Sequence, residues 1–407
     1  MPVVFQPVGV KFAKDSYIIV EGKPNADKFY IIKEGKVRII READRVMPEA
    51  NMAGPGEMFG VVSAMSSHSY IESAIAVTDV ALLAVERKQY GALIRKSIPV
   101  AINTIRQFSQ RLRSLDETLS RRASKSTASD DASHLFHVAE YYDRAGKYSQ
   151  AQYSYQQYLS HCPNAENAEQ VKSKIERAKS RASVARPDYP PGTMVQSYPK
   201  DTLLFAEGES GNNLYIIQTG SVKITKIINN QEVVLAVLNK GDIFGEMAML
   251  ENKPRAASAE IYEDSKLLAV NRKNFTTLIN DQPDMVVRLT MLMSERIWLL
   301  YRQLSNTLIE NPMGRIYDAL LIQLEKNRVD LNSHNPYLCS FGVKELVGMA
   351  GITEKESGDM CQRVLAAKKI ALVTDKVFIS NIAEVLKEVE YYHRAQKMRK
   401  DFKDSMR

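Results

Sequence analysis

The sequence is poor in the residues that build metal and redox centres. Its 407 residues include 3 cysteines and 6 histidines. Cys162, Cys339 and Cys361 lie far apart with no paired spacing, which argues for reduced thiols and against a zinc cluster. His134 and His137 share a helical face, but the sequence offers no third ligand beside them. We therefore predict no metal site.

Long apolar runs and catalytic motifs are scarce as well. The run SAIAVTDVALLAV is broken by a charge well before the ~18 apolar residues that a transmembrane helix needs. The opening MPVVFQPVGVKF lacks the layout of a signal peptide. We find no phosphate loop and no nucleophile-elbow pattern. These absences predict a cytoplasmic protein that contacts no membrane and is not an enzyme.

The chain is long and carries excess positive charge. Its 407 residues exceed what one core accommodates, and about 150 residues per domain suggests roughly three domains. The net charge of +7 is unevenly spread, since residues 171–186 hold six Lys or Arg against one Glu. Such a run permits an anionic partner such as nucleic acid, and a solvated helix face explains it about as well.

Two halves of the chain repeat one pattern. FYIIKEGKV at 29–37 returns as LYIIQTGSV at 214–222, and GEMFG at 56–60 returns as GDIFG at 241–245, in both cases 185 residues later. Each copy has short β-rich runs with glycines and then one amphipathic helix, which predicts a small antiparallel roll closed by a helix. The apolar stripes of the two helices predict pairing across a homodimer or within one chain as a pseudo-dimer. The stripes comprise Ile102, Ile105, Leu112, Leu115 and Leu119 in the first helix, and Leu289, Met293, Ile297, Leu300, Leu304 and Leu308 in the second.

The stretch FGEMAMLENKPRAASA, residues 244–259, places Glu246 and Arg255 nine positions apart among small and apolar residues. A surface ion pair is worth roughly 0 to 1 kcal/mol and needs no function. Small side chains after the arginine, however, let a ligand approach the backbone closely. The stretch resembles the phosphate-binding cassette of cyclic nucleotide-binding domains. That resemblance implies that Glu246 accepts a hydrogen bond from the ribose 2′-hydroxyl, that Arg255 pairs with the cyclic phosphate, and that Ala256 favours cAMP. The implied contact residues are Gly245, Glu246, Met247, Arg255, Ala256 and Ala257.

Physical chemistry agrees with these roles. A cyclic phosphate is a monoanion that is costly to bury without a partner, and a charge-assisted hydrogen bond from Arg255 is worth about 1.5 to 3 kcal/mol. The first copy has Val61 and Tyr70 where the second has Glu246 and Arg255, so we predict one ligand per chain. Trp298 and Tyr301 are candidates for capping the base, and packing in the helix seam is the alternative.

Between the copies lies a helical segment, 133–181, flanked by linkers at 123–132 and 182–192. It resembles a single tetratricopeptide unit. One such unit cannot bury its own face, so we expect it to pack on the helix that follows and on a module or a partner protein. The residues that carry the resemblance are Ala139, Tyr142, Gly146, Tyr148, Ala151, Tyr155 and Pro163.

Residues 309–392 read helix, turn, helix and short hairpin, and they resemble the winged helix of the catabolite activator family. The resemblance implies DNA as a partner. Glu354 and Asp359 stand where family members typically present arginines, and their charge would repel phosphates. The basic tail 393–407 offers sequence-independent affinity. The candidate DNA contacts are the N-cap Thr353 and the side chains of Lys355, Gln362 and Arg363.

Together these features predict an α+β multidomain protein with two cyclic nucleotide-binding rolls at 1–122 and 193–308, a helical insert and a C-terminal winged helix-turn-helix. The favoured function is a cAMP-responsive transcription regulator whose second roll binds the ligand and controls the winged helix. The alternative is a cAMP-sensing adapter that acts through protein contacts, with the tetratricopeptide-like unit as the docking element.

Overall fold

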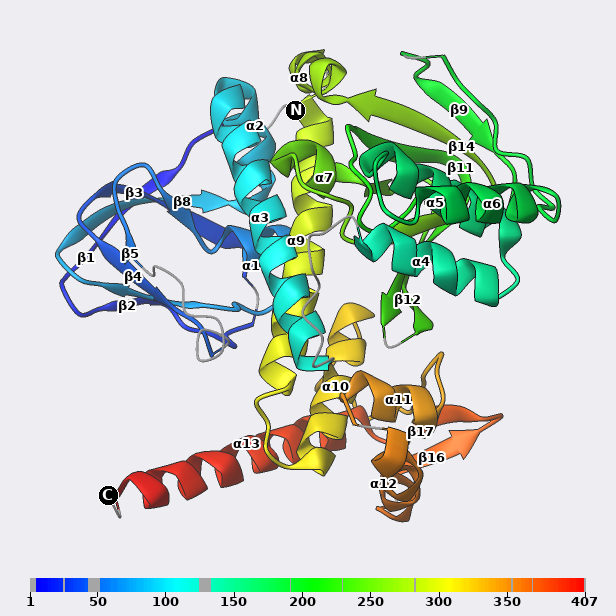
Figure 1. Cartoon of the computed structure of the whole chain (residues 1–407). Helices are drawn as coiled ribbons and strands as arrows, with labels where there is room; N and C mark the ends of the chain where they lie inside the picture. Colours follow the sequence, from blue (N-terminus) through cyan, green and yellow to red (C-terminus); the bar gives the residue numbers. More distant parts are fainter. Residues whose placement is uncertain are drawn as a thin grey trace. The chain divides into compact units, whose positions relative to one another are not determined.

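The computed structural model describes residues 5–24, 26–42, 52–123, 133–190, 192–228, 230–281, 283–352, 354–367 and 369–405 (Figure 1). The chain divides into two compact units, which we name the cassette unit, residues 1–5 and 88–293, and the C-terminal unit, residues 6–87 and 294–407. The division falls inside helix α9, Pro283–Asn306. The predicted linker 123–132 lies, apart from its first residue, outside the described residues.

The C-terminal unit contains the first β-roll, built from two four-stranded antiparallel sheets. Apolar side chains that alternate along short strands, such as Ile32, Val37, Ala74 and Leu82, form its core. One sheet has the order β1 (Val8–Phe12), β8 (Val80–Glu86), β3 (Lys28–Glu34), β6 (Met58–Phe59), and the other β2 (Tyr17–Ile19), β7 (Ser73–Ala76), β4 (Val37–Ile40), β5 (Met52–Ala53). The short helix α1 (Val61–Ser66) follows β6.

The same unit holds the C-terminal helices and a three-stranded sheet of order β15, β17, β16. The Asn311 side chain starts α10 by accepting hydrogen bonds from two backbone amides, and Gly351 takes a left-handed conformation after α11. The elements are α10 (Pro312–Lys326), β15 (Tyr337–Leu338), α11 (Val343–Met349), α12 (Glu354–Ala366), β16 (Ile370–Val373), β17 (Lys376–Ile379) and α13 (Ile382–Ser405). The basic tail is therefore helical as far as Ser405.

The cassette unit contains the second β-roll, a six-stranded sheet. Glycines mark the repeat: a Cβ on Gly220 would lie 2.3 Å from the Asp264 carbonyl oxygen, and one on Gly35 would lie 2.4 Å from that of Asp79. The strands are β9 (Val195–Tyr198), β10 (Leu203–Phe205), β11 (Asn213–Ile228), β12 (Gln231–Leu238), β13 (Ile243–Phe244) and β14 (Ser258–Asn271), with helices α7 (Glu246–Glu251) and α8 (Arg272–Asp281).

The helical insert of the cassette unit packs on this roll. The helical insert, which we call the α4–α6 unit, lies beside the strands of the second β-roll in Figure 1. Its core residues Leu135 and Tyr155 share one apolar cluster with Leu203 and Ala206 of the roll. The insert thus covers its apolar face on a module, one of the two expected surfaces; its assignment as a tetratricopeptide unit stays a prediction. The remaining helices of the cassette unit are α2 (Tyr90–Lys96), α3 (Ile98–Ala123), α4 (Ser133–Arg144), α5 (Tyr148–His161) and α6 (Ala168–Lys179).

Candidate cyclic nucleotide site

The backbone before α7 places the predicted acid inside the second roll. Gly245 has a φ of 77°, a left-handed conformation that turns the chain sharply from β13 into the helix. Glu246 is the first helical residue, and it is 1% exposed. Met247 beside it is also buried. A carboxylate at the first turn of a helix is favoured by the helix dipole.

Arg255 lies deep in the same roll, with 5% of its surface exposed. Its Nη1 donates to the Gly245 carbonyl oxygen at 2.6 Å, and its Nη2 donates to that of Asn213 at 2.8 Å. The guanidinium carbon lies 4.0 Å from the centroid of the Phe205 ring. Nε has no hydrogen-bond partner among the described residues. A buried donor of this kind is costly unless a ligand or water satisfies it.

Burial lowers the pKa of Arg255 from its usual value, and nearby groups, among them Glu209 and Glu246, oppose that shift. An arginine has so high an intrinsic pKa that it keeps its charge in proteins. The site therefore holds a positive charge that is shielded from water, where electrostatic attraction to an anion is stronger than at the surface.

Two glycines make room for this guanidinium. A Cβ on Gly211 would lie 2.2 Å from Arg255 Nε, and one on Gly245 would lie 2.6 Å from Nη1. Gly211 was missing from the residues predicted from the sequence. The glycine-rich sequence GESGNN, which leads into β11, is the pattern that could have indicated Gly211.

A neighbouring segment, residues 206–211, holds the backbone of Arg255. The Arg255 amide donates to the Glu209 carbonyl oxygen at 2.7 Å, and the Gly208 amide donates to the Arg255 carbonyl oxygen at 2.9 Å. Ser210 and Pro254 form a β-bridge. Glu209 is a second residue next to Arg255 that the sequence analysis missed, because a glutamate in a turn has no distinctive pattern.

Two further predicted cassette residues lie next to Arg255 in the chain. Ala256 and Ala257 follow Arg255 directly and are half-buried. Gly245, Glu246 and Arg255 are brought together by the turn into α7 and by the strand β14, which starts within the last residues of the cassette.

Trp298 and Tyr301 belong to the C-terminal unit, and the contacts that we describe for them are with the first β-roll. The Trp298 indole donates to the Ser69 carbonyl oxygen at 3.2 Å, and its ring stacks on His68 with a centroid separation of 3.8 Å. The Arg41 guanidinium lies 5.8 Å from the centroid of the Tyr301 ring. These are packing contacts with the first roll; packing in the helix seam, the alternative interpretation, stays a prediction as well. Base capping by either ring stays a prediction.

The first roll has the same turn with different chemistry. Gly60 takes a φ of 76° before Val61, as Gly245 does before Glu246. The Tyr70 hydroxyl donates to the Lys28 carbonyl oxygen at 2.8 Å. Lys28 is the repeat equivalent of Asn213, so Tyr70 takes the carbonyl that Arg255 takes in the second roll.

Glu72 completes this altered site. Its carboxylate accepts a hydrogen bond from the Gly60 amide at 2.7 Å and pairs with Arg41 at 2.9 Å. The first roll thus has a negative side chain where the second has Ala257. The Gly60 amide and the Arg41 guanidinium are thus both bound to this carboxylate.

The candidate DNA contacts are only partly described. Thr353 lies outside the described residues. Lys355 lies on α12. Gln362 and Arg363 are exposed on the same helix, and Arg363 lies 3.9 Å from Asp359 one turn earlier. An exposed pair of this type holds its arginine weakly.

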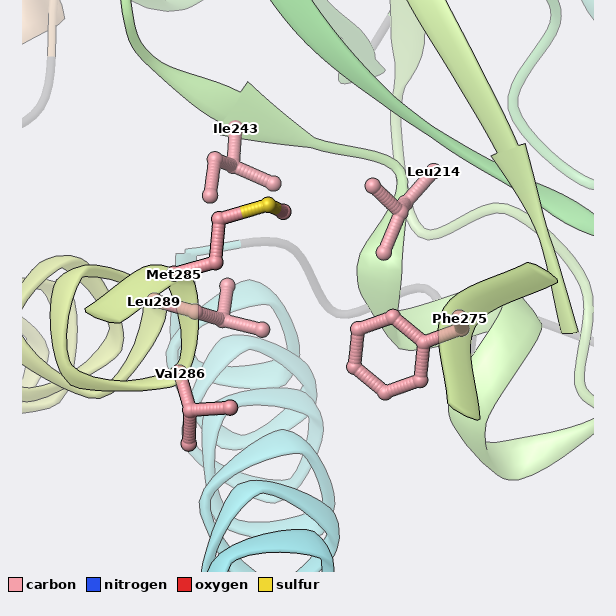
Figure 2. A pocket seen from close by; sticks show the side chains of 6 residues that line it. All are labelled: Leu214, Ile243, Phe275, Met285, Val286 and Leu289. Carbon is pink, nitrogen blue, oxygen red and sulfur yellow. The ribbon is translucent and has the colours of Figure 1, made fainter. Parts of the chain in front are cut away.

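Apolar residues line a small hollow between α9 and the second roll (Figure 2). A cyclic phosphate has no partner there, because none of the lining side chains is polar. They are Leu214, Ile243, Phe275, Met285, Val286 and Leu289. Among the described residues, no cluster of metal-ligating side chains was found. No helix in the described ranges is apolar over a length sufficient to span a membrane.

Comparison with known proteins identifies the two rolls. The family model named cyclic nucleotide-binding domain matches residues 9–97 and 195–282. Each roll is therefore similar to a cyclic nucleotide-binding domain. We call the two rolls the first and the second domain.

The curated relatives include bacterial proteins whose names refer to cAMP. The cyclic AMP receptor protein of Thermus thermophilus is 28% identical over 195 residues, which are 48% of this chain and 87% of that protein. The cAMP-activated global transcriptional regulator CRP of Salmonella typhimurium is 30% identical over 129 residues, 31% of this chain and 61% of the relative. The crystal structure of the Thermus thermophilus catabolite activator protein matches at 27% identity with a TM-score of 0.28, covering 49% of this chain and 90% of that one. The first of these relatives is named as a receptor protein and the second as a transcriptional regulator.

Proposed function

We propose that this protein is a cAMP-responsive transcription regulator and that its second domain binds the ligand. The observation that carries the proposal is Arg255, a buried guanidinium whose Nε is unsatisfied among the described residues, beside the buried Glu246. The relatives support cAMP as the ligand, since their names refer to cAMP. The relation to them supports regulation over an enzymatic role.

The two charged side chains divide the recognition of the ligand. Arg255 supplies a donor for the cyclic phosphate, and the amides of Ala256 and Ala257 add further donors. Glu246 can only accept hydrogen bonds when ionised, so it suits the 2′-hydroxyl of the ribose. A ligand that carries both groups at the correct separation is favoured over inorganic phosphate or a nucleoside alone.

Helix α9 offers a route from the site to the output. Its residues Met285, Val286 and Leu289 line the apolar hollow with Leu214 and Ile243. Leu214 follows Asn213, whose carbonyl binds Arg255, and Ile243 lies two residues before Gly245. We infer that ligand binding shifts these strands against α9, and that α9 transmits the shift toward the segment 309–392 with its candidate winged helix.

Titration calorimetry with cAMP tests the binding step. Arg255→Ala should weaken cAMP binding by about 10- to 150-fold, because it removes a charge-assisted interaction worth about 1.5 to 3 kcal/mol. Tyr70→Phe is the matched control, since it removes the equivalent hydrogen bond of the first domain and should leave the affinity unchanged. Equal binding by wild type and Arg255→Ala would refute the assignment.

The output needs its own measurement. Capture of fragmented genomic DNA by the full chain should enrich specific fragments only with cAMP present. Lys355→Ala combined with Arg363→Ala should remove this enrichment while cAMP binding is retained. If cAMP binds and no fragment is enriched in either condition, the regulator acts through protein partners, as the adapter alternative predicts.

A further inference from the structure

A tyrosine of the helical insert reaches the segment that holds Arg255. The hydroxyl of Tyr153, on α5, lies 2.8 Å from each carboxylate oxygen of Glu209. The Ala206 amide also donates to this carboxylate, at 2.9 Å. Burial raises the pKa of Glu209, and the Ala206 and Tyr153 hydrogen bonds oppose that shift. The phenol therefore supplies one of the donors that a buried carboxylate requires.

Other contacts fix the same junction. The Arg186 guanidinium lies 4.1 Å from the centroid of the Tyr153 ring, and its Nη1 donates to the Leu204 carbonyl oxygen at 2.9 Å. His161, at the end of α5, lies 2.9 Å from the Ser210 hydroxyl through its Nε2. Segment 206–211 is thus held by α5 on one side and by the backbone of Arg255 on the other.

We propose that Tyr153 and Glu209 are positioning residues for Arg255, so that the α4–α6 unit sets the affinity of the second domain for its cyclic phosphate. This inference rests on the function proposed above. Neither residue touches the ligand. Tyr153 holds the Glu209 carboxylate, Glu209 fixes segment 206–211, and that segment's backbone hydrogen bonds hold Arg255.

Electrostatics and linkage both follow from this chain of contacts. Glu209 is among the groups that oppose the lowering of the Arg255 pKa by burial. It therefore stabilises the charged guanidinium as well as helping to hold its position. Coupling between two sites is reciprocal. If docking of α5 strengthens cAMP binding, cAMP binding must tighten the docking of α5 by the same factor.

The decisive variant is Tyr153→Phe in the full chain, with cAMP affinity measured by calorimetry. We expect a loss of about three- to tenfold, the range typical of residues that modulate coupling without touching a ligand. Tyr158→Phe is the matched control. It removes another hydroxyl from α5, one that bonds Asn167 inside the insert at 2.9 Å, and it should leave the affinity unchanged.

A double-mutant cycle separates positioning from general loss of structure. Glu209→Ala should weaken binding at least as much as Tyr153→Phe, and the double variant no more than Glu209→Ala alone, because Tyr153 acts through Glu209. Hydrogen exchange supplies an independent readout. Amides of residues 148–161 should exchange more slowly with cAMP in the wild type, and this protection should shrink in Tyr153→Phe.

The outcomes are distinct. If the wild type binds cAMP and Tyr153→Phe binds it with the same affinity, the inference is overturned and the proposed function stays intact. Additive losses of affinity in the double-mutant cycle would have the same meaning. If Tyr153→Phe unfolds, Glu209→Ala and the wild-type exchange data decide, and no protection of residues 148–161 by bound cAMP counts against the inference. No cAMP binding by the wild type would overturn both proposals.

Discussion

Arg255 and Tyr70 occupy equivalent positions in the two domains, and each donates to the equivalent backbone carbonyl. The tyrosine fills the position with a neutral hydroxyl and an apolar ring, whereas the arginine brings a charge and further donors. The residue at this one position thus decides whether a repeat has a candidate anion site or a packed core. The fold tolerates both, because the hydrogen bond to the carbonyl is preserved.

Gly211 lies so close to the Arg255 guanidinium that one added methyl group should lower the affinity for cAMP. Gly211→Ala would bring a Cβ to within 2.2 Å of Arg255 Nε and displace the guanidinium. We expect cAMP affinity to fall by about tenfold or more, since a misplaced charge loses most of a hydrogen bond worth about 1.5 to 3 kcal/mol. Calorimetry measures this. Gly9→Ala, whose Cβ would meet nothing within 4 Å, is the control, and equal affinities for both variants would contradict the prediction.

A second residue-level prediction concerns thiol reactivity. Burial raises the pKa of Cys339 to about 11, because it disfavours the charged thiolate. Cys162 and Cys361 are half-buried. At pH 8 the thiolate fraction of Cys339 is about 0.1%, so iodoacetamide should modify it about 100-fold more slowly than a thiol of ordinary pKa. Its rate should rise about tenfold per pH unit up to about pH 11. Mass spectrometry follows each cysteine, and denatured protein should show three similar rates.

Helix α3 belongs by sequence to the first repeat, yet it packs on the cassette helix α7 of the second domain. Arg113 donates through Nε to the Glu251 carboxylate at 2.8 Å and through Nη2 to the Pro254 carbonyl oxygen at 3.1 Å. The Ser109 hydroxyl donates to the same carboxylate at 2.5 Å. Both charged side chains are almost fully buried, 7% and 3% exposed. This contact lies within one chain; a homodimer stays a prediction.

Removing one member of the Arg113–Glu251 pair should lower the free energy of unfolding of the protein. Glu251→Ala leaves the Arg113 charge buried without its partner, and we expect a loss of about 3 to 5 kcal/mol in the free energy of unfolding. Lys172→Ala removes a pair whose side chains are 61% and 87% exposed and should change stability by less than about 1 kcal/mol. Urea unfolding compares the two. Similar midpoints for both variants would show that the α3 contact contributes little.

For the whole molecule, the two domains differ in charge at the anion position. The second domain presents Arg255 there, whereas the first presents the neutral Tyr70, and its Glu72, at the position of Ala257, is paired with Arg41. A tandem protein of this kind is expected to carry one responsive domain and one that serves the architecture. Its net charge of +7 adds a general attraction to nucleic acid.

The stoichiometry of cAMP binding checks this division. We expect one cAMP per chain in the wild type and no tight binding in Arg255→Ala, because the first domain has Tyr70 in place of the arginine. Calorimetry with protein concentration fixed by absorbance gives the number directly. Two ligands per chain, one of them retained in Arg255→Ala, would show that the first domain binds despite Tyr70 and Glu72.

The sequence by itself determined the repeat, the cassette and the loss of charge in the first copy. These are local patterns, in which residue type and spacing indicate the chemistry: Gly245 for a turn, and Glu246 and Arg255 for the proposed contacts to a sugar and its phosphate. The existence of the helical insert and the C-terminal helices followed from apolar periodicity in the same way.

Only the tertiary structure decided what lies around those residues. The carbonyl of Asn213, the space at Gly211 and the link from Tyr153 to Glu209 join segments 42, 44 and 56 residues apart in the chain. The contact of Trp298 with Ser69 is of the same kind, since it joins residues 229 positions apart. Such contacts depend on how rolls and helices pack, and packing reflects the shape of whole surfaces, which a local pattern of residues does not encode.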